Sequence, residues 1–104
     1  GINNLMADTY QTSLFIMVKH IEAQPKHKPT RNEQEFKTLL LSILHHNKTN
    51  NGYAIQTTEE ARDDFILLAQ LAAESRDQRL IDIVNKSLNE AYESAKEYHN
   101  FILK

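Results

Sequence analysis

Apolar residues recur every three or four positions over most of the chain, the spacing that places them on one face of an α-helix. Four stretches carry this pattern, at about residues 3–24, 31–47, 58–74 and 76–103. The connections between them are short, so helices that follow one another in sequence are expected to be antiparallel neighbours. The pattern therefore predicts an all-α fold, an antiparallel up-down-up-down four-helix bundle.

Helix breakers and capping signals set the predicted boundaries. The chain contains two Gly and two Pro, and both prolines lie within residues 25–29, where the first helix is expected to end. A capping box, a Ser or Thr followed three residues later by Glu or Gln, opens each of the other helices. The pairs are Thr30 with Glu33, Thr57 with Glu60, and Ser75 with Gln78. A turn at residues 48–52 is predicted to end the second helix.

The third and fourth helices have distinctive patterns. Residues 65–73 are apolar almost all round, which predicts that the third helix is the most buried one. In the fourth, apolar positions alternate by three and four over three heptads, from Ile81 to Ile102. We expect a tight turn at residues 75–77 between these helices. One continuous helix over residues 58–103 is the alternative, because no Gly or Pro marks that turn.

Composition limits the classes of protein that fit. A chain of 104 residues is expected to form one domain, spanning residues 1–104. With 12 Lys and Arg, 14 Asp and Glu and a net charge of −2, it is too neutral for a dedicated nucleic-acid-binding protein. No stretch approaches the roughly 20 apolar residues of a membrane span. Neither a nucleic acid nor a membrane is therefore expected as a partner.

The absence of cysteine removes several kinds of chemistry. Without Cys there is no disulfide, no thiolate metal site, no Cys nucleophile and no covalent CxxCH attachment of haem. Paired carboxylates, a Ser-His-Asp set and a Gly-rich phosphate loop do not stand out either. The sequence therefore does not predict an enzyme.

Basic residues gather around the first loop. The first 52 residues carry six Lys and Arg against four acids, and residues 53–104 carry six against ten. The basic cluster comprises Lys19, His20, Lys26, His27, Lys28 and Arg31. It either docks an anionic partner or is a solvated loop. The second interpretation is favoured, because no aromatic residues interleave with the cations.

Two adjacent histidines, His45 and His46, come at the end of the predicted second helix. Cationic imidazoles complement the negative end of the helix dipole, which is the simpler interpretation. His45 with Lys48 also matches the HxxK core of histidine phosphotransfer domains, although residues 47–52 are expected to break the helix there.

The two ends of the chain are the strongest candidates for cofactor chemistry. In an antiparallel four-helix bundle, the first helix starts at the end of the molecule where the fourth helix stops. Met6 and His99 each lie next to the apolar stripe of their helix. A thioether and an imidazole that face each other across a bundle end can serve as the axial ligands of a b-type haem. In the alternative interpretation, Met6 fills the core and His99 is a boundary residue that contacts water.

The second half of the chain resembles a known family. Residues 62–68 (RDDFILL) and 71–73 (LAA), a polar turn, and a long helix ending in AKEYH at residues 95–99 resemble the soluble cytochrome b562 family. The same ending is similar to the related c′-type cytochromes, with Ala95 and Tyr98 at the positions of the two haem-linked cysteines. The resemblance covers about the last 45 residues.

The resemblance implies a bundle that binds haem b non-covalently and transfers electrons to a redox partner protein. It implies His99 and Met6 as the two axial ligands of the iron. The residues that it implies along the haem pocket are Tyr10, Leu14, Phe65, Tyr98 and Ile102. It also implies a periplasmic protein whose signal peptide has been removed, in agreement with a chain that begins with Gly1. If Met6 is instead the native start, a cytoplasmic protein is expected.

The sequence thus leaves two hypotheses about function. The first is a periplasmic electron-transfer protein with one haem b, a monomer or weak homodimer. The alternative is a cofactor-free helical interaction module, such as a small inhibitor, immunity-type or regulatory protein. Such a protein would work through an exposed helix face or through the basic first loop. When the apolar stripe of the first helix is superposed on that of the family, the ligand position falls on Ala7, one residue from Met6, which keeps this alternative open.

Overall fold

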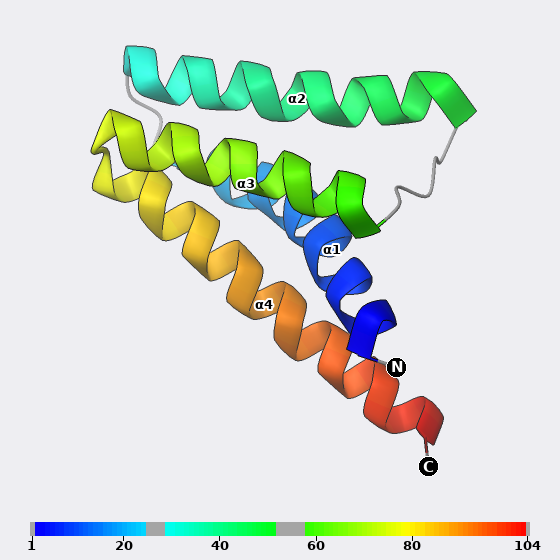
Figure 1. Ribbon diagram of the computed structural model, residues 1–104. Coiled ribbons are helices and arrows are strands. Elements are labelled where there is room, and N and C mark those ends of the chain that lie inside the picture. The colour runs from blue at the N-terminus through cyan, green and yellow to red at the C-terminus, as the bar shows by residue number, and fades with distance from the viewer. Residues whose placement is uncertain (1, 25–28, 52–57, 104) are drawn as a thin grey trace.

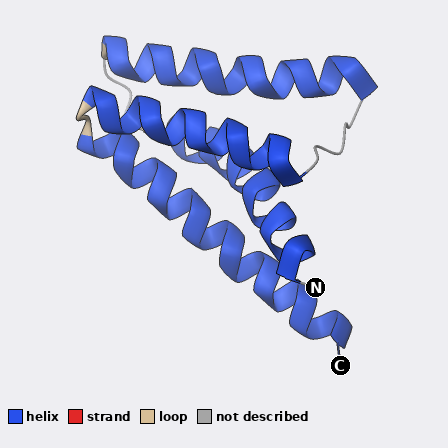
Figure 2. Cartoon of the chain, viewed as in Figure 1, coloured by secondary structure: helices blue, strands red, loops and turns tan. Residues whose placement is uncertain are grey.

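The computed structural model describes residues 2–24, 29–51 and 58–103, and within them the side chains of residues 9–24, 29–45 and 60–97. The described residues form four helices and no strand (Figures 1 and 2): α1 (Ile2–Glu22), α2 (Arg31–Asn51), α3 (Thr58–Ser75) and α4 (Gln78–Leu103). Successive helices run in alternating directions. The all-α four-helix fold expected from the sequence is confirmed.

The helices do not pack equally. The most extensive contact is between α1 and α4, followed by that between α1 and α3, whereas α2 packs less extensively on α1 and α3. Figure 1 shows α4 diverging from α3 along its length, with α1 behind them, and the two ends of the chain at the same end of the molecule. The bundle therefore brings the start of α1 close to the end of α4, as the topology predicts.

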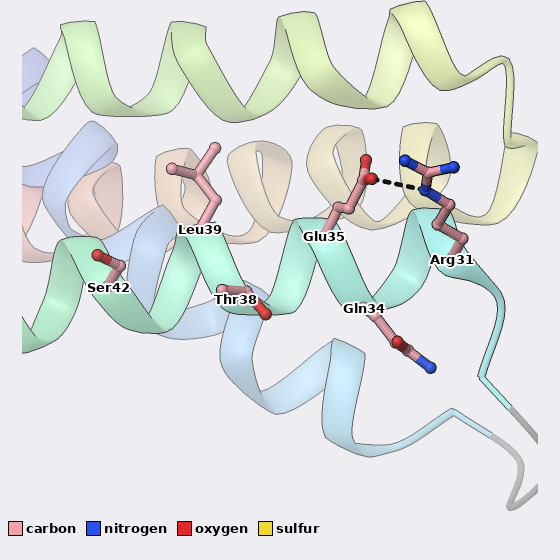
Figure 3. Close-up of a pocket in the computed structure, with 6 residues that line it drawn as sticks. All are labelled: Arg31, Gln34, Glu35, Thr38, Leu39 and Ser42. Atoms are coloured by element: carbon pink, nitrogen blue, oxygen red, sulfur yellow. Dashed lines mark hydrogen bonds and ion pairs between the residues drawn. The ribbon is translucent and has the colours of Figure 1, made fainter.

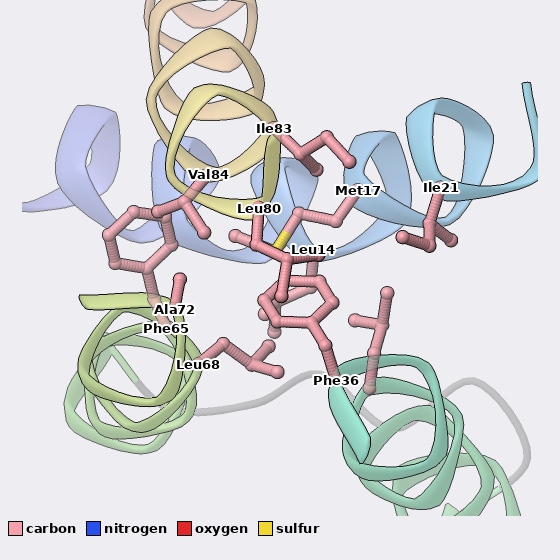
Figure 4. Close-up of a cluster of buried hydrophobic side chains, with 11 residues drawn as sticks. Leu14, Met17, Ile21, Phe36, Phe65, Leu68, Ala72, Leu80, Ile83 and Val84 are labelled. Carbon is pink, nitrogen blue, oxygen red and sulfur yellow. The ribbon is translucent and has the colours of Figure 1, made fainter. Parts of the chain in front are cut away.

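One apolar core joins all four helices (Figure 4). Its residues with no exposed surface are Leu14, Met17, Phe36, Leu40, Leu68 and Leu80. Full burial of one such side chain is worth about 1.5–3 kcal/mol relative to leaving it exposed. The core lies where α1, α2, α3 and the first half of α4 meet.

Small side chains explain the close contact of α1 with α4. Thr9 and Ser13 of α1, and Ser87, Ala91 and Ala95 of α4, are all buried. Side-chain size at a contact sets the distance between two helices, so these residues let the two backbones approach closely. Ser13 donates its hydroxyl hydrogen to the carbonyl oxygen of Tyr10 at 2.7 Å. The Ser87 hydroxyl, by contrast, has no hydrogen-bond partner among the described residues.

The predicted turn at residues 75–77 is confirmed, which excludes one continuous helix. Arg76 adopts a left-handed conformation with φ of 57°, and this reverses the chain. The Ser75 hydroxyl donates to the Ala72 carbonyl at 2.7 Å and accepts the Asp77 N–H at 3.2 Å. The N-cap of α4 is Asp77, whose carboxylate accepts the Arg79 N–H at 3.0 Å. The prediction of Ser75 as the cap was wrong, because Ser75 still closes the last turn of α3.

The other predicted boundaries hold at the start of α2 and fail at its end. Glu33 donates its backbone N–H to the Thr30 hydroxyl at 3.2 Å, so the cap at Thr30 is confirmed. Residues 48–51 continue α2 to Asn51 rather than forming a turn. Asn and Thr are only modestly unfavourable inside a helix, and the first strong breaker is Gly52. The predicted cap at Thr57 lies outside the described residues.

The prediction that α3 is the most buried helix is wrong for one of its sides. Phe65, Leu68 and Ala72 belong to the core, and α3 contacts each of the other three helices. Yet Ile66 is 41% exposed and Leu67 is 47% exposed. The three neighbouring helices cover only part of the circumference of α3, so the apolar pattern extends beyond the surface that the bundle buries.

Candidate functional site

Three of the predicted haem-pocket residues lie among the described side chains, and all three are packed in the core. Leu14 has no exposed surface and Phe65 is 7% exposed. The ring of Tyr10 lies against that of Phe65, with 5.5 Å between the ring centroids and a tilt of 52°. These side chains fill the space between α1 and α3 by contacting one another, so they do not frame an open slot. A haem-lining role for them stays a prediction.

The two predicted axial ligands lie on the helices that make the most extensive contact, Met6 in α1 and His99 in α4. Their side chains, with those of Tyr98 and Ile102, fall outside the described residues. Among the described residues, no group of three or more His, Cys, Asp or Glu is placed to hold a metal ion. Thr9 of α1 and Ala95 of α4 are both buried, and these two helices make the most extensive contact.

A first surface feature is the exposed side of α3. We call Asp63, Ile66, Leu67, Gln70 and Glu74 the α3 outer face; all five are exposed. Their spacing of three and four residues places them on one side of the helix. This face combines two large apolar side chains with two carboxylates. The sequence analysis did not predict this face, because it interpreted the apolar pattern of α3 as burial.

A second feature is a cavity of about 550 Å³ between α1 and α2, which we call the α1–α2 groove. It is lined by Ile21, Gln24, Pro29, Glu33, Gln34, Lys37, Thr38 and Leu41. Leu41 is 42% exposed and Ile21 is 8% exposed, so part of the apolar lining is reachable from solvent. Such a volume is within the range of ligand-binding clefts.

The charge of the α1–α2 groove is set by two of its residues. Glu33 is almost fully buried, and its carboxylate Oε1 lies 2.6 Å from Nη2 of Arg79, so an ion pair compensates its charge. Lys37 is exposed and supplies the positive charge of the lining. Sequence reasoning did not single out Lys37 or Leu41, because both lie off the predicted apolar stripe of α2.

A shallow hollow adjoins this groove on α2 itself (Figure 3). It has a volume of about 570 Å³ and is lined by Arg31, Gln34, Glu35, Thr38, Leu39 and Ser42, all from α2. Gln34 and Thr38 line both depressions, so they form the ridge of α2 that separates the hollow from the α1–α2 groove. Nε of Arg31 donates to Oε1 of Glu35 at 3.0 Å, one turn along the helix. Arg31, predicted as part of a basic cluster, is thus paired with an acid.

A third feature links the end of α1 to the middle of α4. One ring nitrogen of His20 lies 2.9 Å from Oε2 of Glu90, and the His20 side chain is 16% exposed. The hydrogen bond to His20 is the main cause that lowers the pKa of the Glu90 carboxyl below its ordinary value of 4.5. A cavity of about 240 Å³ beside the pair is lined by His20, Gln24, Arg79, Asp82, Ile83 and Lys86. The sequence pattern gave no sign of this pair, which joins residues 70 positions apart.

No described helix is both long enough and apolar enough to cross a membrane. Comparison of the chain with protein-family models, with curated proteins and with solved structures gives no significant match.

Proposed function

We propose that this chain is a helical interaction module that works through exposed apolar helix surfaces and needs no cofactor. The observation that carries the proposal is the α3 outer face. The segment at residues 65–73 is apolar almost all round, and such a segment is normally buried. Within this bundle Ile66 and Leu67 stay exposed, so they are available to a partner.

The α1–α2 groove supports the same proposal. Leu41 is an exposed leucine in the lining of the groove, which also contains Ile21 and polar and charged groups. Recognition surfaces commonly have this composition, with apolar anchors at the centre and a polar rim. Scattered exposed apolar residues occur on most proteins; here the paired Ile66 and Leu67, and Leu41 within a cavity, go beyond that background.

Site-specific photo-crosslinking in cells that make the protein naturally tests this proposal. A photoreactive amino acid would replace Leu67 or Leu41, and an equally simple replacement of Asn89, an exposed polar residue of α4, provides the matched control. We expect discrete adducts at Leu67 and Leu41 and none at Asn89. Adducts of equal intensity at all three positions, or none at any, would refute the proposal.

We also propose a second candidate, electron transfer by a bound haem b in the periplasm, with a redox protein as partner. The juxtaposition of the start of α1 and the end of α4 favours it, together with the resemblance in the second half of the chain. Met6 and His99 would hold the iron, which supplies one-electron redox chemistry when bound. A thioether ligand favours the ferrous state and raises the reduction potential.

Titration of the purified chain with haemin tests the second candidate. A haem held by His99 gives a sharp Soret shift that His99→Ala abolishes, whereas His45→Ala, a change at an exposed histidine of α2, leaves it intact. No shift, or a shift that persists in His99→Ala, would eliminate haem binding by these residues. Interaction through the α3 outer face is independent of this result.

A further inference from the structure

We infer that the α3 outer face receives an amphipathic helix of another protein, whose apolar anchors are flanked on both sides by Lys or Arg. The inference rests on the proposed interaction function and names the chemistry of the partner. Ile66 is 41% exposed and Leu67 is 47% exposed. In Figure 1, α1 lies behind α3 and no described helix lies in front of it, so this side of α3 is open.

Exposed carboxylates lie on the same side of α3 as Leu67. Glu60, Asp63, Leu67, Gln70 and Glu74 follow one another at intervals of three and four residues, and all five are exposed. This spacing places them along one line of the helix surface. Leu67 lies midway between Glu60 and Glu74, about 10 Å along the helix axis from each. The face thus has an apolar centre with an acid two turns away on either side.

The net charge of this side of α3 is negative. Its exposed side chains include three acids, Glu60, Asp63 and Glu74, and one base, Arg62. The Arg62 guanidinium lies 3.7 Å from the Asp63 carboxylate and can compensate one of the three negative charges. Two further acids stand at the two ends of the face, so a partner that covers Leu67 meets negative charge in both directions.

This charge distribution selects among possible occupants. In a symmetric contact between two copies of the face, carboxylates would meet carboxylates, and like charges across an interface are unfavourable. Anionic lipids and the phosphates of a nucleic acid are repelled for the same reason. Amphipathic helices bind through apolar side chains three and four residues apart. A helix of this kind with Lys or Arg on both sides of its anchors complements the apolar centre and the acids together.

Binding of a synthetic peptide, measured by fluorescence anisotropy, tests the inference. The probe is an amphipathic peptide of roughly 25 residues, long enough to form a helix, with leucines in its central turns and lysines about two turns to either side. A second peptide has glutamate in place of each lysine. We expect the lysine peptide to bind about tenfold more tightly than the glutamate peptide, and the difference to shrink as salt screens the charges.

A substitution at the apolar centre locates the binding site. Leu67→Ser should weaken binding of the lysine peptide about tenfold, because it removes an anchor. Tyr92→Ser is the matched control, since Tyr92 is 41% exposed on α4, outside the α3 outer face. Equal weakening by the two changes, or no binding of the lysine peptide by the wild type, would overturn the inference.

Charge reversal separates a specific contact from general attraction between opposite charges. Glu60→Lys combined with Glu74→Lys should reverse the preference, so that the glutamate peptide binds more tightly. Glu93→Lys combined with Glu97→Lys is the matched control, because it changes the net charge equally at two exposed acids of α4. Circular dichroism establishes that the variants keep their helical content, as expected for exposed positions. The same reversal in the control, or unchanged preference in the α3 variant, would overturn the inference.

The crosslinking experiment distinguishes failure of this inference from failure of the proposed function. Adducts at Leu67 that map to a helical segment with Lys or Arg support both. Adducts at Leu67 that map to a segment without these residues, or to a second copy of this chain, would overturn the inference and leave the proposed function standing. Absence of adducts at every position would remove the proposed function and the inference with it.

Discussion

Replacement of Arg79 by Leu is expected to destabilise the bundle by about 2 kcal/mol, since it removes the partner of a buried carboxylate. Glu33 stands in the first turn of α2 and is 8% exposed, and Arg79 stands in the first turn of α4. The contact of 2.6 Å between them therefore ties the starts of two helices that are distant in sequence. Leu is chosen because it keeps part of the apolar stem of arginine.

The magnitude follows from the burial of the two partners. Breaking a fully buried ion pair by removing one partner costs about 3–5 kcal/mol, because the other charge is left uncompensated. The Arg79 side chain is 44% exposed, so water can solvate part of the stranded Glu33 carboxylate. This screening reduces the expected cost to about 2 kcal/mol. For a domain of this size, that loss lowers Tm by roughly 10 °C.

A double-mutant cycle measures the effect. Urea unfolding followed by helical circular dichroism would be recorded for the wild type, Arg79→Leu, Glu33→Gln and the double variant. The double variant should be less destabilised than the sum of the two single variants by about 1 kcal/mol or more, because it contains no uncompensated charge. A loss below about 0.5 kcal/mol in Arg79→Leu, or additivity of the two changes, would show that the pair is solvated and does not join α2 to α4.

Other predictions follow from burial and hydrogen bonding at single positions. His20→Ala should raise the pKa of Glu90 towards its ordinary value, as measured by NMR titration of the carboxyl group. Because the folded-state pKa of Glu90 is depressed, its pairing with His20 stabilises the protein at pH values above the ordinary carboxyl pKa. This stabilisation is lost as the pH falls through the folded-state pKa. Identical acid unfolding profiles of the wild type and the His20→Ala variant would contradict this. Leu68→Ala should cost about 2–5 kcal/mol in urea unfolding, and Leu67→Ala less than about 0.5 kcal/mol, because only Leu68 is buried; equal losses would contradict the placement of the two residues. Ser87→Ala should raise stability by about 0.5–1.5 kcal/mol, since it removes a buried hydroxyl without a described partner; a loss of stability would show that this hydroxyl is hydrogen-bonded in solution.

The regular parts of the fold were predictable because local patterns specify them. The heptads of α4 and the Thr30 cap depend on residues within a few positions of one another, and both sequence and structure agree there. The turn at Arg76 was predictable in place, although its cap was assigned to the wrong residue. The end of α2 was placed too early because Asn and Thr weaken a helix without terminating it.

The candidate site was harder to predict because it depends on tertiary structure. His20 and Glu90 meet only when α1 packs on α4, and nothing in their local sequences indicates this contact. Likewise, the almost uniform apolarity of residues 65–73 was interpreted as burial, although the three neighbouring helices leave Ile66 and Leu67 uncovered. The apolar pattern of a helix shows how much apolar surface the helix has. It does not show whether the residues that pack on this surface belong to the same chain.

The close packing of α1 on α4 has a consequence for how the molecule assembles. The helix pair with the most extensive contact is also the pair most distant in sequence. The small residues Thr9 and Ser13 acquire their neighbours on α4 only when Ser87, Ala91 and Ala95 have left the ribosome. During synthesis α1 therefore lacks its principal partner until α4 has been made. The long chain segment between α1 and α4 must close before they pack, which is expected to slow folding relative to a bundle stabilised by sequential hairpins. Chains shortened within α4 should accumulate as partly folded, aggregation-prone species, because their first helix has lost part of the surface that buries it.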